Sequence, residues 1–160
     1  MNKGVNDTLL SNFELMSIQT EVLFSHIELP PPTLRLEEGV FSVKMIKITE
    51  TNKELLQYSF PNLLNQLKWR QPCFVILENE MIASRCCSAR STAIAAEASV
   101  ETLVSFQRKG YGYNIVAAWA TAVQEEGRIP LYSTSWNNFA SQAVAKKLNL
   151  INYGTDIHFS

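Results

Sequence analysis

The residues between positions 97 and 113 carry the strongest chemical signal in the sequence. Small or apolar residues alternate with acidic ones from 97 to 104, a pattern that predicts a strand. Gly110 and Gly112 follow in a short turn, and a helical pattern of apolar residues continues to about residue 125. At such a junction glycines let the backbone approach an anion, and the unpaired N–H groups and the helix dipole favour its negative charge. The sequence therefore predicts a site for a phosphate group at this turn.

Two common phosphate-binding motifs do not fit this turn. A dinucleotide fingerprint requires a third glycine three residues after the second, but position 115 is Ile. A P-loop requires Gly-Lys followed by Ser or Thr, which the chain lacks. Gln107, Gly110 and Gly112 instead match the pattern Gln/Arg-x-x-Gly-x-Gly/Ala. That pattern resembles the pyrophosphate-binding motif of the GNAT superfamily, the acetyl-CoA-dependent N-acyltransferases.

A second segment strengthens the resemblance. Residues 129–135 have the pattern of a strand, and the segment 138–150 follows it. This segment is similar to the family's second signature, Asn-x-x-Ala/Ser-x-x-Leu-Tyr-x-Lys-Leu/Ala-Gly-Phe. Ala145 stands where that signature often has a Tyr. The two signatures occur in the family's order, and the resemblance extends from Phe41 to about Phe159.

The resemblance implies an α/β (α+β) fold with a mixed central sheet flanked by helices. In that fold two nearly parallel strands splay apart and acyl-CoA enters between them; here these would be the strands of Glu97 and Leu131. The implied reaction transfers an acetyl group from acetyl-CoA, as co-substrate, to an amine of a small molecule or peptide by direct attack on the thioester. No metal is implied.

The resemblance also assigns groups to the cofactor. Backbone groups of 102–104 would pair with the pantetheine amides, backbone N–H groups of 108–112 would take the pyrophosphate, and the side chain of Asn138 would contact pantetheine. Arg108, Lys109 and Lys146 are candidates for the adenosine phosphate. The cofactor-binding residues expected in this way are Thr102, Leu103, Val104, Gln107, Arg108, Lys109, Gly110, Tyr111, Gly112, Asn138 and Ser141.

Acetylation of an amine calls for a base, because an alkylammonium with a pKa of about 10.4 is less than roughly one part in a thousand neutral at pH 7. Glu97 and Glu101 are four residues apart on the predicted strand, so their side chains share a face. The resemblance favours Glu97 as the base. The alternative is that one or both carboxylates are solvated residues at the strand edge.

The departing thiolate needs a proton, and Ala145 cannot supply one. Ser141, Tyr153 or water could take that role, and the predicted catalytic residues are therefore Glu97, Glu101 and Tyr153. The alternative function is an acyl-CoA-binding or interaction module that has lost turnover. Ala145, Gln107 and the short segment after the second signature favour that alternative.

Composition narrows the class of protein. The chain of 160 residues suits one domain, and 46% hydrophobic with 18% charged residues argues against disorder. A net charge of −1 gives no general attraction to nucleic acid or to an anionic membrane. Cys73, Cys86 and Cys87 lack the spacing of a disulfide framework or zinc site, which favours small buried residues in a reducing compartment. No export signal or membrane span is evident, so we expect a cytoplasmic protein.

The N-terminal part is predicted to be an addition to the family domain. Apolar residues from Leu9 to Ile27 recur near one face and predict a helix that begins at Asp7 or Thr8 and ends before the prolines 30–32. Residues 1–39 would form this helical extension with its proline spacer, and 40–160 the catalytic domain. The apolar face would pack either on the domain or on a second copy, as in a homodimer.

The remaining elements follow from periodicity and turn residues. Only one strand fits after Leu150, whereas the family commonly ends in a two-stranded hairpin. The sheet edge would then be shortened, or completed by the N-terminal segment or by a partner. The predicted elements are a strand at 40–48, helices within 50–69 divided by Pro61, a hairpin at 73–77 and 81–90, helices at 111–125 and 138–148, and a last strand at 151–159.

Overall fold

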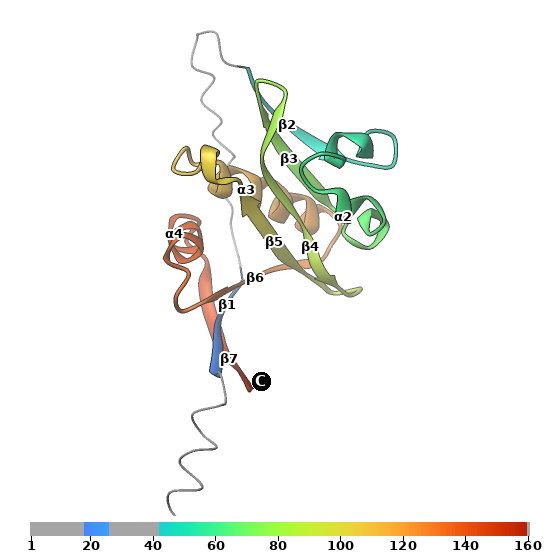
Figure 1. The fold of residues 1–160 in the computed structure, drawn as a ribbon. Helices are drawn as coiled ribbons and strands as arrows, with labels where there is room; N and C mark the ends of the chain where they lie inside the picture. The colour runs from blue at the N-terminus through green and yellow to red at the C-terminus, as the bar shows by residue number, and fades with distance from the viewer. Residues whose placement is uncertain (1–17, 26–41, 160) are drawn as a thin grey trace, which may run out of the picture.

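The computed structural model describes residues 18–25 and 42–159, which form one mixed sheet with helices on both faces (Figure 1). The strand order is β2-β3-β4-β5-β6-β1-β7, and only β5 and β6 pair in parallel. The strands are β1 (Ile18–Ser25), β2 (Val43–Ile48), β3 (Cys73–Glu78), β4 (Met81–Ser91), β5 (Ala95–Thr102), β6 (Ile129–Ser135) and β7 (Ile151–Phe159). This confirms the predicted α/β architecture.

The helical elements differ greatly in length. They are η1 (Lys53–Leu56), α2 (Pro61–Leu64), η2 (Leu67–Trp69), η3 (Val104–Phe106), α3 (Tyr111–Glu125) and α4 (Phe139–Lys147). The helices at 111–125 and 138–148 are confirmed almost to the residue. The segment 50–69 forms three short turns of 3₁₀ or α type in place of the longer helices predicted. Pro61 begins α2, where its missing N–H costs no hydrogen bond.

Each face of the sheet has its own apolar core. On one face α3 packs through Ile115 and Trp119 against even-numbered residues of β5 such as Ala96. On the other face Leu56, Leu63 and Leu67 from η1, α2 and η2 cover β3 and β4. The odd-numbered residues of β5 therefore lie on the face that carries α2.

The parallel pair β5–β6 is short and then opens. Its ladder joins Ala95 to Ile129, Ala96 to Pro130 and Glu97 to Leu131, and does not extend further. Each strand continues beyond this point, β5 to Thr102 and β6 to Ser135. The two strands thus form the fork that the resemblance implied, with Glu97 and Leu131 at its apex.

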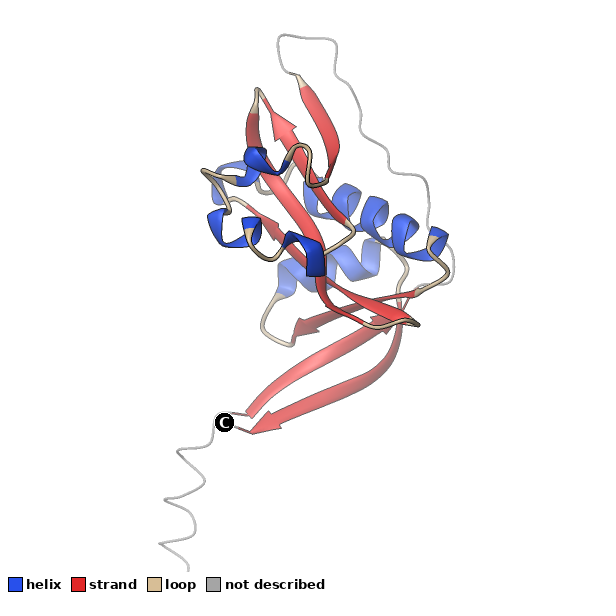
Figure 2. Cartoon of the chain, turned by 90° about the vertical axis from the view of Figure 1, so that its right-hand side faces the viewer, coloured by secondary structure: helices blue, strands red, loops and turns tan. Residues whose placement is uncertain are grey.

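The N-terminal prediction is wrong where the structure describes it. Residues 18–25 form a strand, not a helix, and β1 pairs antiparallel with β6 on one side and β7 on the other. Figure 2 shows β1 and β7 side by side, extending away from the helices. Of the three possibilities left open, completion by the N-terminal segment is thus the one observed, but β1 is inserted between β6 and β7, and β7 forms the edge of the sheet. The proposed cap at Asp7 or Thr8, the prolines 30–32 and the boundary at residue 39 lie outside the described residues.

The cysteine interpretation is corrected for two of the three residues. The register of β3 and β4 places Cys73 opposite Cys87, and the two form a disulfide, with both side chains buried. Cys86 faces α3 instead, and it is the free, buried thiol that was expected. Among the described residues, no helix is long and apolar enough to cross a membrane.

Candidate functional site

The phosphate turn forms as its glycines require. Gly110 has φ of +80° and caps the N-terminus of α3, a conformation that glycine adopts without strain. The first intrahelical hydrogen bond joins Asn114 N–H to the Gly110 carbonyl, 3.1 Å apart. The N–H groups of Tyr111, Gly112 and Tyr113 precede it and have no helical carbonyl to bond. These groups and the helix dipole fit the predicted anion site.

Gly112 lies where three elements meet. A Cβ atom at this position would be 3.5 Å from Cγ2 of Val144 on α4 and 3.7 Å from Oγ1 of Thr102 on β5. A methyl group would fit at these distances. A longer side chain would occupy space beside the phosphate turn. Gln107 is held beside it, because its Nε2 donates to the Thr102 carbonyl over 3.4 Å.

Two of the expected cofactor contacts are engaged elsewhere. The Leu103 N–H donates to the Ala83 carbonyl at 3.0 Å, and the Leu103 carbonyl accepts from Phe106 N–H at 2.8 Å. The Leu103 N–H, which was predicted to pair with pantetheine, is thus bonded within the protein, and Val104 belongs to the turn η3 and not to the strand. The ammonium of Lys109, a candidate for the adenosine phosphate, forms an ion pair with Glu78 at 2.6 Å, and the Lys109 side chain is 43% exposed. Arg108 is exposed at φ of +64°, beside the turn.

Glu97 occupies the apex of the fork on the face of α2. Its Oε1 accepts from the Ser133 hydroxyl at 2.6 Å, and its Oε2 accepts from Arg90 Nε at 2.8 Å. The side chain is only 16% exposed, whereas that of Arg90 is 71% exposed. These contacts fix a carboxylate at the point where the two strands separate.

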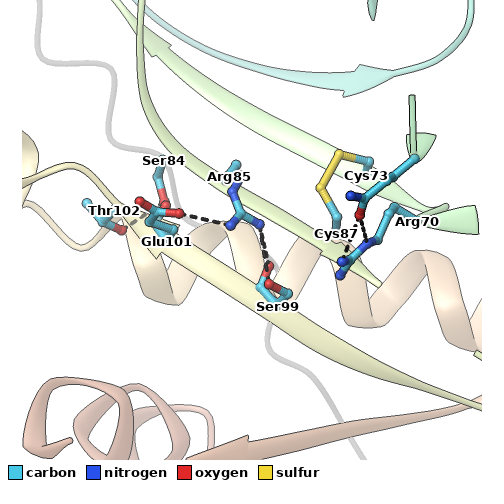
Figure 3. A network of polar contacts seen from close by, with 9 residues as sticks. Arg70, Cys73, Ser84, Arg85, Cys87, Ser99, Glu101 and Thr102 are labelled. Atoms are coloured by element: carbon cyan, nitrogen blue, oxygen red, sulfur yellow. Dashed lines mark hydrogen bonds and ion pairs between the residues drawn. A yellow bond between two sulfur atoms is a disulfide. The ribbon is translucent and has the colours of Figure 1, made fainter. Parts of the chain in front are cut away.

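Glu101 lies on the same face, as predicted, in a different setting. Arg85 from β4 donates to Glu101 Oε2 at 2.9 Å and to Ser99 Oγ at 3.3 Å, as Figure 3 shows. The guanidinium also covers the ring of Phe60, 4.9 Å from its centre, and its buried Nε has no hydrogen-bond partner among the described residues. The Glu101 side chain is 48% exposed. Arg85 thus fixes one oxygen of Glu101 and joins β4 and β5 to Phe60, the residue that precedes α2.

The region of the missing tyrosine contains a different pair of hydroxyl groups. Ala145 is fully buried, and one turn before it Ser141 Oγ lies 2.5 Å from Tyr132 Oη. Burial raises the pKa of Tyr132 to about 12. Asn138 caps α4, since its Oδ1 accepts from Ser141 N–H at 3.0 Å. Tyr153 on β7 is 51% exposed. Its pKa is raised, mainly by partial burial and to a smaller extent by the negative charge of Glu97.

Sequence reasoning missed four residues of the site. Arg85, Arg90 and Ser133 come from neighbouring strands and reach the two glutamates only through the register of the sheet. Glu78 reaches the phosphate turn from the end of β3. No spacing within one segment could reveal these partners. Arg85 and Arg90 are visible in the sequence as the charged residues of the second hairpin strand, but the sequence does not specify which residues they face.

Comparisons with known proteins agree with this geometry. The family model described as GNAT acetyltransferase matches residues 35–155. No curated protein matches the chain.

Several solved structures share the fold. A GCN5-related N-acetyltransferase-like protein from Streptococcus suis superposes with a TM-score of 0.67 at 17% identity, over 99% of this chain and 68% of that one. A GCN5-related N-acetyltransferase from Sphaerobacter thermophilus gives 0.68 at 12%, over 99% and 57%. The chain thus spans less than two thirds of the latter protein. A Salmonella typhimurium protein solved with its cofactor acetyl-CoA gives 0.56 at 17%, over 73% and 91%.

Proposed function

Since the chain belongs to the GNAT acetyltransferase family, we propose that it transfers an acetyl group from acetyl-CoA to an amine of a small molecule or peptide. The observation that carries this proposal is the fork. The β5–β6 ladder stops at Glu97 and Leu131, and the glycine turn stands at the far end of the β5 arm. A thioester at the apex and a pyrophosphate at the turn would thus lie at the two ends of one strand, β5. The Salmonella protein of similar fold was solved with acetyl-CoA.

The residues present fit acetyl-CoA as a substrate. Gly110 and Gly112 leave the turn without side chains where backbone N–H groups must meet phosphate, and Arg108 stands beside it. Backbone groups of β5 beyond Glu97 are not part of the β6 ladder. They can accept the pantetheine amides as a strand would.

Glu97 is the proposed general base. The amine nitrogen attacks the thioester carbonyl carbon while its proton passes to the Glu97 carboxylate, directly or through water. A C–N bond forms, the C–S bond breaks, and the thiolate takes up a proton. A backbone N–H of β5 near the apex stabilises the oxyanion, a contribution typically worth about 3 kcal/mol. Ser133 and Arg90 orient the carboxylate for this step.

The thiolate leaves without a tyrosine from α4. A thiol with a pKa near 8.5, the value of a free cysteine, is a tolerable leaving group at neutral pH. The N–H groups at the start of α4 add favourable electrostatics. Ser141 stands in that first turn, hydrogen-bonded to Tyr132, and is the alternative proton donor that we consider on this helix.

One observation supports a second function. Ala145 replaces the residue that commonly protonates the thiolate, which favours a module that binds acetyl-CoA without turnover. Release of free thiol from acetyl-CoA, measured with a panel of small amines and peptides, separates the two. Amine-dependent release supports the transferase, and binding without release supports the module. Failure to bind acetyl-CoA contradicts both.

A further inference from the structure

Glu78 connects the sheet to the phosphate turn. It is the last residue of β3, and its side chain is 9% exposed. Its Oε1 accepts from Lys109 Nζ at 2.6 Å, and its Oε2 accepts from the Tyr111 hydroxyl. Lys109 and Tyr111 are the two residues on either side of Gly110. One buried carboxylate therefore holds the turn on both sides of its left-handed glycine.

A carboxylate here has no evident purpose in attracting the ligand. A negative charge close to a pyrophosphate repels it, so the charge of Glu78 opposes binding unless a cation offsets it. The Lys109 ammonium provides that offset and also lies 5.5 Å from the centre of the Phe106 ring in η3. The pair has no net charge, and what it offers the ligand is geometry.

The turn needs such support. Arg108 at φ of +64° and Gly110 at +80° both occupy the left-handed region, within three residues. A glycine-containing segment has many competing conformations, and each one populated in the free protein weakens binding of the ligand that requires a single one. Anchoring the flanking side chains to a rigid strand restricts those alternatives before the ligand arrives.

We propose that Glu78 is a positioning residue for acetyl-CoA. It holds Lys109 and Tyr111 so that the N–H groups around Gly110 face the pyrophosphate, and it keeps the Lys109 ammonium away from the phosphates. This inference rests on the proposed binding of acetyl-CoA. In this proposal Lys109 supports the turn and stays away from the phosphates, whereas the sequence suggested that it contacts a phosphate directly.

The test compares two ligands on the full chain. Acetyl-CoA reaches the turn through its pyrophosphate, whereas S-acetylpantetheine lacks that group. Calorimetry on Glu78→Gln should show the Kd of acetyl-CoA raised by about tenfold, with that of S-acetylpantetheine unchanged. Tyr111→Phe, which keeps the Lys109 contact, should give a smaller loss. Lys109→Met should weaken acetyl-CoA binding in the wild-type background and add little to Glu78→Gln, because both break the same contact.

Glu80→Gln is the matched control. It breaks the ion pair between Glu80 and Lys44. Glu80 is two residues after Glu78 in the chain, and its ion pair lies on the surface and includes no residue of the phosphate turn. Its Kd for both ligands should equal that of the wild type. Equal weakening of both ligands by Glu78→Gln would show a merely structural role and overturn the inference. Tighter acetyl-CoA binding would overturn it too, by revealing Lys109 as a restrained phosphate ligand. The wild type alone tests acetyl-CoA binding itself, so failure of the proposed function is recognised separately.

Discussion

The Glu97 carboxylate accepts a 2.6 Å hydrogen bond from the Ser133 hydroxyl across the apex of the fork. The bond joins β5 to β6 just where their ladder ends, so the carboxylate is fixed relative to both arms. Arg90 holds the second oxygen from β4. A base placed by three strands needs little rearrangement when the amine arrives, which is the condition for efficient proton transfer.

We expect Glu97→Gln to lower the turnover number by roughly 10²–10⁴, the usual contribution of a general base. Glutamine keeps the shape and can still accept from Ser133, so affinity for acetyl-CoA should stay nearly unchanged. Steady-state rates with saturating acetyl-CoA and a calorimetric Kd provide the two measurements. Glu101→Gln is the control on the same face, bound to Arg85 and far from the apex. Small, equal effects from both variants would show that neither carboxylate is the base.

Acetyl-CoA at 100 times its Kd should stabilise the fold by about 2.7 kcal/mol. For a chain of this length that corresponds to a rise in Tm of roughly 5–10 °C. A thermal melt with and without ligand provides the measurement. An unchanged Tm at millimolar acetyl-CoA would contradict the cofactor assignment.

Gly110→Ala should both destabilise the fold and weaken this ligand effect. The position has φ of +80° with space for a methyl group, so the cost is conformational, about 1–2 kcal/mol. Gly127→Ala is the matched control, since it also has positive φ, at +73°, but stands at the other end of α3. The two variants should melt at similarly lowered temperatures. Only Gly110→Ala should show a reduced shift with acetyl-CoA, and an equal shift in both would separate the turn from the cofactor.

The turnover number, measured as a function of pH, should show no decrease at alkaline pH from ionisation of a tyrosine. If the thiolate leaves unaided, turnover rises with pH through the pKa of the base and stays flat to about pH 9. A phenol acting as acid would instead make the rate fall as it ionises. Tyr153→Phe should therefore leave turnover nearly unchanged, and its half-exposed position on β7 is consistent with this. A loss of about 100-fold, with the alkaline limb abolished, would identify Tyr153 as the acid.

Because of Glu78, the free energy of unfolding should depend on pH in the acid range. The Lys109 ammonium and then the Tyr111 hydroxyl hold the pKa of Glu78 below its usual value in the folded state. Its contribution is therefore fully present above the unfolded pKa of about 4.3 and is lost as pH falls through the folded pKa. Urea unfolding at pH 7 and pH 3 should show that the wild type exceeds Glu78→Gln in free energy of unfolding at pH 7 and that this difference shrinks at pH 3. A difference independent of pH would contradict the linkage.

The sequence predicted those parts of the fold that local patterns determine. The glycine turn, the helix 111–125 and the hairpin of β3 and β4 are correct because caps, turn residues and periodicity lie within each segment. Asn149, which follows the C-cap of α4, has φ of +54°, a left-handed conformation that Asn tolerates at this place. The shared face of Glu97 and Glu101 followed from the period of a strand alone.

The errors arise where the structure of a segment depends on residues that are far away in the sequence. Residues 18–25 satisfy a helical spacing of apolar residues, but β6 and β7 provide partners on both sides and a strand results. Cys73 and Cys87 are 14 residues apart, and only the register of the hairpin places them opposite one another. The contacts of Leu103 with Ala83 and of Lys109 with Glu78 join different strands and turns, so no single segment of the sequence could indicate them. The predicted contacts of Leu103 and Lys109 with the cofactor stay predictions.

Because β1 lies between β6 and β7, we expect the two arms of the fork to form at different times during folding. β5 pairs with β4 through a short connection, so that arm can form early. The β6 arm is flanked by β1, and the pair Glu21–Ser135 joins residues 114 positions apart (135 − 21). Contacts of such sequence separation form slowly, because closing a long loop costs conformational entropy before the contact contributes any stabilisation. During refolding, therefore, the capacity to bind acetyl-CoA should appear after the hairpin and α3 are already in place.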